Sequence, residues 1–227
     1  MSNDQITPVT EPSDEGTSRR WFLGAAAAVA AGGVLAACSK DDSKVETGAS
    51  TVTTGAATTA TTAAGGAGDA SVAKLAAGLE VLAVGTYKAA LDAATAKKLG
   101  TVPDAVATFA TTVMGHHQTA REAWNKVLTG AGQPAVSAPP ASLKATVDTK
   151  FAAVKDVTGV AELALLLEQT AADTYLSATK TLQGKDALTM AGALQSVDQE
   201  HAAILLYVLG KYPVPAVFQK TDKAFKG

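Results

Sequence analysis

Residues 163–175 read LALLLEQTAADTY, and this stretch decides how the chain folds. It sets Glu168 in the middle of a run that otherwise has the composition of a buried helix. Moving an ionised carboxylate out of water costs several kcal/mol even after the protein relaxes. Glu168 is therefore expected to be exposed, protonated, paired with a cationic group or bound to a metal ion.

The same arrangement occurs earlier in the chain. Residues 79–87 read LEVLAVGTY and residues 167–175 read LEQTAADTY, so Leu-Glu and Thr-Tyr recur at an offset of 88 residues. Each glutamate is followed by a tyrosine seven residues later, about two helical turns away, so the two are expected on one helical face. The pattern favours packing roles for Tyr87 and Tyr175.

A second repeat follows the first, at an offset of 81 residues. Its members are Val127-Leu128 and Pro134-Ala135-Val136, which recur as Val208-Leu209 and Pro215-Ala216-Val217. This register sets His117 opposite Asp198, and Ala120 opposite His201. A duplicated two-helix unit, with a glutamate on its first helix and ligand-type residues on its second, is how a four-helix metal bundle is built.

These motifs make the chain resemble the ferritin-like superfamily. In the di-metal members of that superfamily, two helices give one glutamate each and the other two give Glu-x-x-His each, all pointing inward. The resemblance implies an all-α, ferritin-like four-helix bundle with a long crossover between helices 2 and 3. It also implies a core that binds iron, manganese or zinc.

The ligand set departs from the superfamily pattern. His117 stands where the first Glu-x-x-His has its glutamate, Ala120 stands where it has its histidine, and Asp198 is a shortened form of the second glutamate. Histidine cannot bridge two metal ions as a carboxylate does. The departures favour one ion, an asymmetric or weak pair, or a bundle that has lost its metal.

Five inward polar side chains are predicted to form the metal site: Glu80, His117, Glu168, Asp198 and His201. Iron, manganese and zinc all accept carboxylates and imidazoles. The alternative is a buried hydrogen-bond network without an ion, in which a glutamate binds His117 or His201. His116 lies about 100° further round the helix than His117, so the two are not expected to face the centre equally.

The four long helices are predicted over residues 72–99, 103–129, 160–183 and 186–209, with a short helix at 143–154. The link between the second and third long helices is too long for a tight turn, so these two are expected to run parallel. Trp124 and Val208 are expected on the inward stripes. After Tyr212 the prolines predict an extended tail, with its apolar residues lying against the bundle.

Residues 1–37 read as a twin-arginine signal peptide, with Arg19 and Arg20 before an uncharged apolar stretch. That stretch ends in Leu35-Ala36-Ala37-Cys38, which matches the lipobox of bacterial lipoproteins. A transmembrane anchor is the alternative, but the run is shorter than the roughly 20 residues of a spanning helix. Cys38 is the only cysteine, which excludes an intramolecular disulfide.

The predicted organisation is therefore a signal peptide at 1–37, a disordered Thr/Ala/Gly tether at 38–70, and the bundle with its extended tail at 71–227. The predicted function is a metal-binding envelope protein, held on the extracytoplasmic side by a lipid at Cys38. Metal oxidation or oxidative protection is its expected role, and whether it is an enzyme stays open. The alternative is a metal-free structural or protein-interaction bundle.

Two other classes of function find no support in the sequence. From residue 72 onward the chain has no basic stripe, so no nucleic-acid partner is expected. It also has neither a nucleophile elbow nor a glycine-rich phosphate loop in that region, which argues against hydrolase and nucleotide-binding chemistry.

Overall fold

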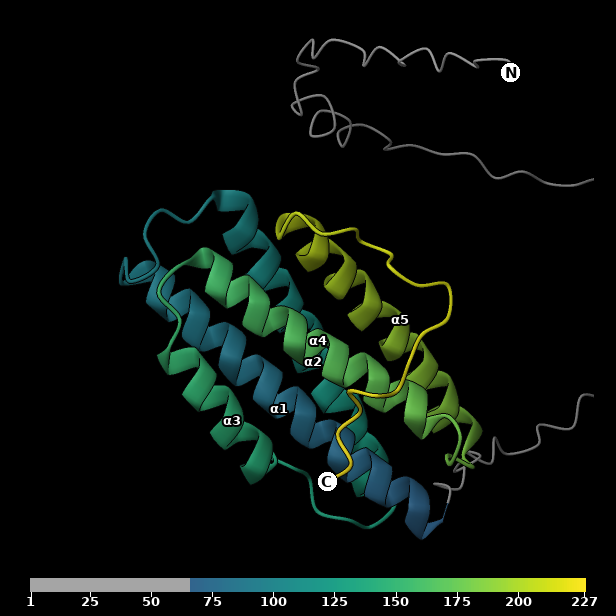
Figure 1. Cartoon of the computed structure of the whole chain (residues 1–227). Coiled ribbons are helices and arrows are strands. Elements are labelled where there is room, and N and C mark those ends of the chain that lie inside the picture. Colours follow the sequence, from purple (N-terminus) through teal and green to yellow (C-terminus); the bar gives the residue numbers. More distant parts are fainter. Residues whose placement is uncertain (1–65) are drawn as a thin grey trace, which may run out of the picture. The chain divides into compact units, whose positions relative to one another are not determined.

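The structure is a computed structural model that describes residues 66–227, and this part of the chain forms five α-helices (Figure 1). In chain order they are α1 (Ala67–Thr95), α2 (Asp104–Gly130), α3 (Ala141–Ala152), α4 (Val157–Ala178) and α5 (Lys185–Val208). The described residues contain no strand, so the all-α prediction is confirmed. The predicted signal peptide, Cys38 and most of the predicted tether lie outside the described residues.

The crossover makes α2 and α4 parallel, as the sequence predicts. His117 of α2 contacts Glu168 of α4, and Trp124 of α2 contacts Tyr175 of α4. Both pairs are 51 residues apart, and a constant difference between partners is the register of parallel helices. The connection that makes this possible runs from 131 to 156 and contains α3.

The helices α1 and α4 are antiparallel. Glu80 of α1 contacts Tyr175, and Tyr87 of α1 contacts Glu168. Moving seven residues forward along α1 therefore moves the partner seven residues back along α4. Both pairs of sequence neighbours, α1 with α2 and α4 with α5, pack along their lengths (Figure 1).

The core of the bundle has two apolar parts with a polar layer between them. One part surrounds Trp124, Tyr175 and Leu128, and is otherwise mostly alanine. The other surrounds Tyr87 and Val113. On each of the four long helices the predicted site residues fall between the members of the two parts. Alanine lets helices approach closely, so the polar side chains are held in a narrow space.

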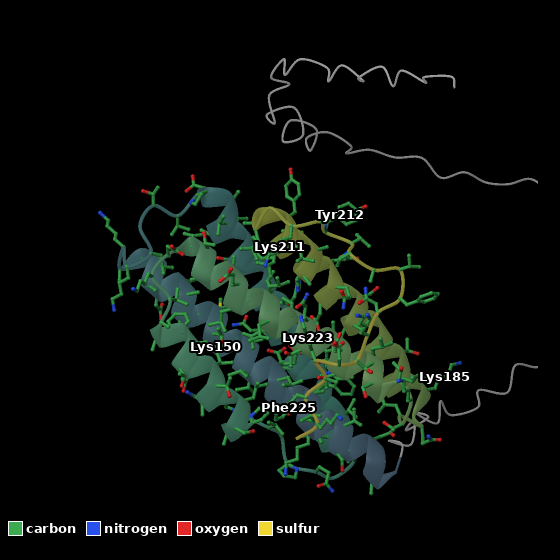
Figure 2. All side chains as sticks on the ribbon, viewed as in Figure 1. Lys150, Lys185, Lys211, Tyr212, Lys223 and Phe225 are labelled. Atoms are coloured by element: carbon green, nitrogen blue, oxygen red, sulfur yellow. The ribbon has the colours of Figure 1, made fainter. Side chains whose placement is uncertain are left out.

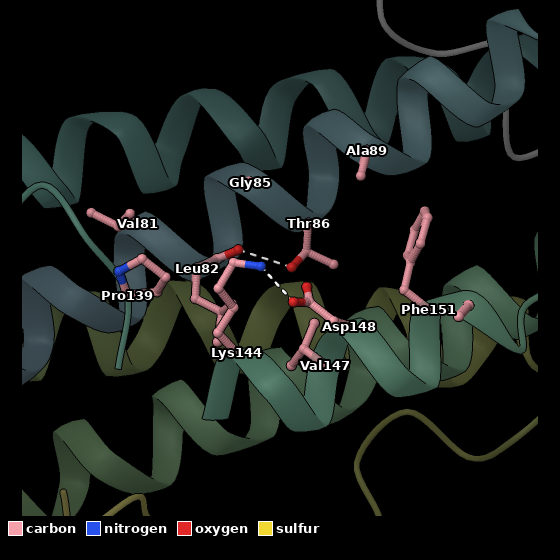
Figure 3. A pocket seen from close by; sticks show the side chains of 11 residues that line it. Val81, Leu82, Gly85, Thr86, Ala89, Pro139, Lys144, Val147, Asp148 and Phe151 are labelled. Carbon is pink, nitrogen blue, oxygen red and sulfur yellow. Dashed lines mark hydrogen bonds and ion pairs between the residues drawn. The ribbon is translucent and has the colours of Figure 1, made fainter. Parts of the chain in front are cut away.

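The short helix α3 lies outside the four long helices and covers the outer side of α1 and α4. Its Val147 packs in one cluster with Leu82 of α1 and with Leu163 and Leu167 of α4. A groove of about 430 Å³ remains between α1 and α3 (Figure 3). Its walls include Gly85, whose missing side chain leaves open space.

Asp69 explains why α1 starts at Ala67, five residues before the predicted start. Its side chain is buried, and its carboxylate accepts the backbone N–H groups of Gln183 at 2.9 Å and Gly184 at 2.7 Å. This holds the α4–α5 turn against the first turn of α1. It also accounts for the early end of α4 at Ala178, because the predicted last turn, up to Gln183, forms that connection instead.

The C-terminal tail folds back over α4, but two predictions about apolar residues in this region are wrong. Lys223 donates its backbone N–H to Asp173 and Phe225 donates its own to Thr174, each at 2.9 Å (Figure 2). The residues between α5 and this attachment are not packed: Phe218 is 85% exposed. Val208, expected on the inward stripe, is 52% exposed, because Leu205 and Leu209 occupy the packed face at the end of α5 instead.

None of the helices within residues 66–227 is long and apolar enough to cross a bilayer.

Candidate metal centre

Four buried side chains from three helices meet in the polar layer. They are His117 of α2, Glu168 of α4, and Asp198 and His201 of α5. One potential ligand atom from each lies within 4.8 Å of those of the others. Asp198 and His201 are three residues apart, so they share one face of α5. The group could hold a metal ion.

Glu80 lies beside this group rather than in it. Its Oε2 is 2.7 Å from Nδ1 of His117, and Nε2 of the same ring is 3.2 Å from Oε1 of Glu168. The imidazole of His117 therefore connects the glutamates of α1 and α4. All five side chains that the sequence singles out lie together, four as a compact donor set and the fifth bonded to one of the four.

Each glutamate also accepts a hydrogen bond from the tyrosine of the other repeat. Tyr87 donates its hydroxyl to Oε1 of Glu168 at 2.6 Å, and Tyr175 donates to Oε1 of Glu80. Both tyrosines are buried, so they are hydrogen-bond donors within the centre and not only packing residues. The antiparallel register of α1 and α4 causes this crossed pairing.

Trp124 extends the network on one side. Its indole N–H donates to the Tyr175 hydroxyl at 2.9 Å, and the two rings stack with centroids 5.9 Å apart. Trp124 is buried, as predicted. It fixes the orientation of the phenol that holds Glu80.

His116 closes the other side of the network. Its Nδ1 lies 3.0 Å from Nε2 of His201, while Nδ1 of His201 lies 3.0 Å from Oε2 of Glu168. The two imidazoles are stacked, with an angle of 16° between their planes. His116 is exposed, so it joins the buried centre to the protein surface. Helical periodicity places it away from the centre, and no sequence signal revealed that α5 would meet it there.

The charges around Glu168 favour its ionised form. Burial alone would raise the pKa of Glu168, but His117 and His201 outweigh it and hold this pKa at about 2 instead of 4.5. Burial likewise opposes protonation of His117, yet Glu168 and Glu80 raise the pKa of His117 well above 6.5. His117, Glu80 and Glu168 therefore stabilise one another's charged forms.

The surroundings of Asp198, in contrast, favour its neutral form. Burial raises its pKa well above the usual value, and the negative charges of Glu80 and Glu168 raise it further, with only partial relief from His117. Its Oδ1 lies 4.0 Å from Nδ1 of His201, too far for a hydrogen bond. Its Oδ2 is buried and has no hydrogen-bond partner among the described residues.

The residues present fit a transition-metal ion. Two imidazoles and two carboxylates are accepted by iron, manganese and zinc. Metal-ligating histidines usually have their second nitrogen bound, which fixes the tautomer. Here Glu80 binds the second nitrogen of His117, and His116 binds that of His201. The unpartnered Asp198 oxygen adds a buried acceptor in need of a cation or a proton.

Comparison with known proteins gives the family of the chain. A family model described as a ferritin-like domain matches residues 68–211, more than half of the 227 residues. The chain belongs to the ferritin-like domain family. No curated protein and no solved structure matches it.

The ferritin-like match begins at the first turn of α1 and ends just after α5, so it covers every helix that contributes to the centre. The protein is therefore a ferritin-like domain whose buried His/Glu/Asp group could hold a metal ion. Ala120, at the position where the superfamily pattern has a histidine, is buried in α2 and adds no donor.

Proposed function

We propose that this protein is a metalloprotein that binds one transition-metal ion through His117, Glu168, Asp198 and His201. The observation that carries the proposal is the unpartnered Oδ2 of Asp198. A buried polar atom left without a partner costs about 1–3 kcal/mol, and more for a charged group. A cation beside Asp198 would remove that cost.

The donor arrangement favours one ion rather than two. Glu80 contributes both of its oxygens to the protein, Oε1 to Tyr175 and Oε2 to His117. It lies outside the compact donor group and binds the ring nitrogen of His117 that faces away from Glu168, so it orients His117 instead of serving as a ligand. Four donors then remain, which is enough for one four-coordinate ion.

The surrounding residues position the donors. Glu80 holds Nδ1 of His117, so that Nε2 points toward Glu168 and the donor group. Tyr87 holds one oxygen of Glu168 and leaves the carboxylate fixed beside His201. All four donors are buried, so water is excluded from most of their surface. Iron or manganese bound there would supply one-electron chemistry toward oxygen species, in keeping with a role in metal oxidation or oxidative protection.

Elemental analysis of the protein purified from its own host tests this proposal. We expect about one iron, manganese or zinc ion per chain, and loss of that ion in Asp198→Asn, because a neutral amide cannot replace a carboxylate ligand. Glu200→Gln is the matched control, since Glu200 lies on the same helix and is exposed. If the purified protein is metal-free and its melting temperature does not change with added metal or chelator, the result would favour the alternative, a structural bundle held by the Glu–His network.

We further propose that the chain is exported by the twin-arginine route and anchored by a lipid at Cys38, on the extracytoplasmic side of the membrane. The support is the sequence alone: Arg19 and Arg20, the apolar stretch and the lipobox. Replacement of Cys38 by alanine should release the protein from membranes or leave the precursor uncleaved. A normally processed, membrane-bound Cys38→Ala protein would contradict the anchor.

A further inference from the structure

His116 is the point at which the buried centre reaches the protein surface. Its side chain is exposed, whereas the four proposed ligands are all buried. Nδ1 of His116 lies 3.0 Å from Nε2 of His201, and the two stacked rings have their centroids 5.2 Å apart. Nδ1 of His201 lies in turn 3.0 Å from Oε2 of Glu168. Two imidazoles in succession therefore connect the solvent with the donor group.

The centre is closed along the axis of the bundle. The apolar part of the core on one side of it contains Trp124 and Leu128, and the part on the other side contains Val113 and Leu205, all of them buried. A metal ion that crossed either part would leave water without gaining a ligand, and an unpaired charge in apolar surroundings costs several kcal/mol or more. Entry along the axis is therefore unfavourable.

The side of the bundle formed by α1 and α4 is closed as well. The helix α3 lies on this side, away from α5 (Figure 1), and its Val147 packs on Leu82 and Leu163. Further in, Glu80 is buried and both of its oxygens are hydrogen-bonded. The cavity that remains beside Glu80 and His117 has a volume of about 10 Å³, which is at most the room that one water molecule needs.

The contact between α2 and α5 provides a polar connection from the surface to the centre. At the level of the centre it contains Phe109, whose ring edge meets His201 with centroids 6.2 Å apart, and the stacked ring of His116. Phe109 is half-buried and has no donor atom for a metal ion. The imidazole of His116 is therefore the ligand that an ion arriving at this contact from solvent meets before His201.

We propose that His116 is the entry ligand of the centre, which binds a transition-metal ion at the surface and passes it to His201 and the other buried donors. The inference rests on the proposed function, because it requires that the four donors hold an ion. Imidazole is the commonest side-chain ligand of transition metals. An exposed side chain changes rotamer within nanoseconds, so His116 can turn between the solvent and His201. His116 is outside the compact donor group, and it contacts the ion during entry and release only.

This role predicts an effect on rates without an effect on affinity. A side chain that contacts the ion only in passage lowers the barrier to entry and the barrier to release by the same amount, so the Kd does not change. A side chain that only orients a ligand acts on the bound state, and its loss raises the Kd. The two rate constants together therefore distinguish an entry ligand from a residue that merely positions His201.

Stopped-flow measurement of cobalt(II) binding to the chelator-treated protein tests the inference. Cobalt(II) binds at sites with nitrogen and oxygen ligands, and its visible absorption reports binding directly. His116→Asn is the test variant, because the asparagine amide keeps a hydrogen-bonding group near the place of Nδ1 but is a weak ligand for this ion. Because His116 is exposed, the change should leave the melting temperature of the metal-free protein unaltered.

We expect association with cobalt(II), and dissociation into excess chelator, each to slow by at least about fivefold in His116→Asn, with a Kd within about twofold of the wild-type value. Gln118→Asn is the matched control, because Gln118 is an exposed residue of the same helix and should leave both rate constants unchanged.

Each other result overturns the inference. Unchanged rate constants in His116→Asn mean that the ion enters elsewhere, and an increase in both means that His116 obstructs entry. A higher Kd caused by faster dissociation alone identifies His116 as a positioning residue for His201. Failure of the proposed function is seen separately, because a wild-type protein that binds no cobalt(II), iron, manganese or zinc at equilibrium has no metal centre, and both proposals are then wrong.

Discussion

Replacement of Glu168 by glutamine tests the charge balance of the centre most directly. The change keeps the volume of the side chain but removes its negative charge. Glu168 is fully buried and accepts from Tyr87, and its two oxygens also face the rings of His117 and His201 at 3.2 and 3.0 Å. Glutamine has only one acceptor oxygen, so at least one of these bonds is lost in the variant.

The expected loss of stability follows from the pKa of Glu168. In the metal-free protein this pKa is held at about 2, against an ordinary value of 4.5. A tenfold change in a protonation equilibrium corresponds to about 1.4 kcal/mol, so the ionised carboxylate contributes about 3 kcal/mol relative to its neutral form. For a domain of this size, that loss lowers the melting temperature by about 6–12 °C.

The sign of the pH dependence is determined by the lowered pKa. The stabilisation is fully present above the unfolded value near 4.5, and it is lost as the pH falls toward the folded value of about 2. Denaturant titrations of chelator-treated wild type and Glu168→Gln at pH 7, repeated at decreasing pH, measure the difference. The gap between the two proteins should close in that acidic window.

Glu162→Gln is the matched control, because Glu162 lies on the same helix and is exposed. It should change the unfolding free energy by less than about 0.5 kcal/mol. A chelator-treated Glu168→Gln protein as stable as wild type at pH 7 would refute the reasoning, since Glu168 would then be repelled by the other carboxylates rather than paired with the histidines.

Three further outcomes are expected. Asp198→Asn should leave the metal-free protein at least as stable as wild type at pH 7, because it removes a carboxylate whose pKa burial and two glutamates raise, and thermal melts with chelator check this. Asp69→Ala should cost about 2–4 kcal/mol in denaturant titrations, since two backbone N–H groups lose their acceptor. Because the pKa of His117 is raised in the folded protein, its contribution to the free energy of unfolding should be present below about pH 6.5 and lost as the pH rises through the folded pKa. Chelator-treated His117→Gln should not show this loss of stability at alkaline pH.

The sequence predicts the fold well because the features that set it are local. Leu-Glu and Thr-Tyr repeat at helical spacing, and the long link after α2 leaves parallel α2 and α4 as the compact solution. The helix ends were harder to predict. The start of α1 and the end of α4 depend on Asp69, whose acceptor role is a contact across 114 residues that no local pattern contains.

The sequence predicts which polar residues lie in the centre but not which of them are hydrogen-bonded to one another. The five polar residues follow from their positions on inward stripes, whereas the crossed bonds of Tyr87 and Tyr175 depend on the register of α1 against α4. That register could have been inferred once the two helices were expected to be antiparallel, since both tyrosines lie seven residues after a glutamate. The exposed loop at Phe218 could not, because proline spacing predicts an extended chain but not what it rests on.

The two repeats give a scaffold of equivalent parts, but the centre built on it is asymmetric. Both first helices keep a glutamate held by the tyrosine of the other repeat. The second helices differ: His117 lies between Glu80 and Glu168 and pairs with both, while the equivalent Asp198 adds a further negative charge. In the metal-free protein the positive charge of His117 is shared by these two glutamates, and an ion bound by Nε2 of His117 would replace it. Asp198 has no cationic partner of this kind, so the single ion proposed above would lie on the α5 side of the bundle, beside Asp198 and His201, and not as one of a symmetric pair.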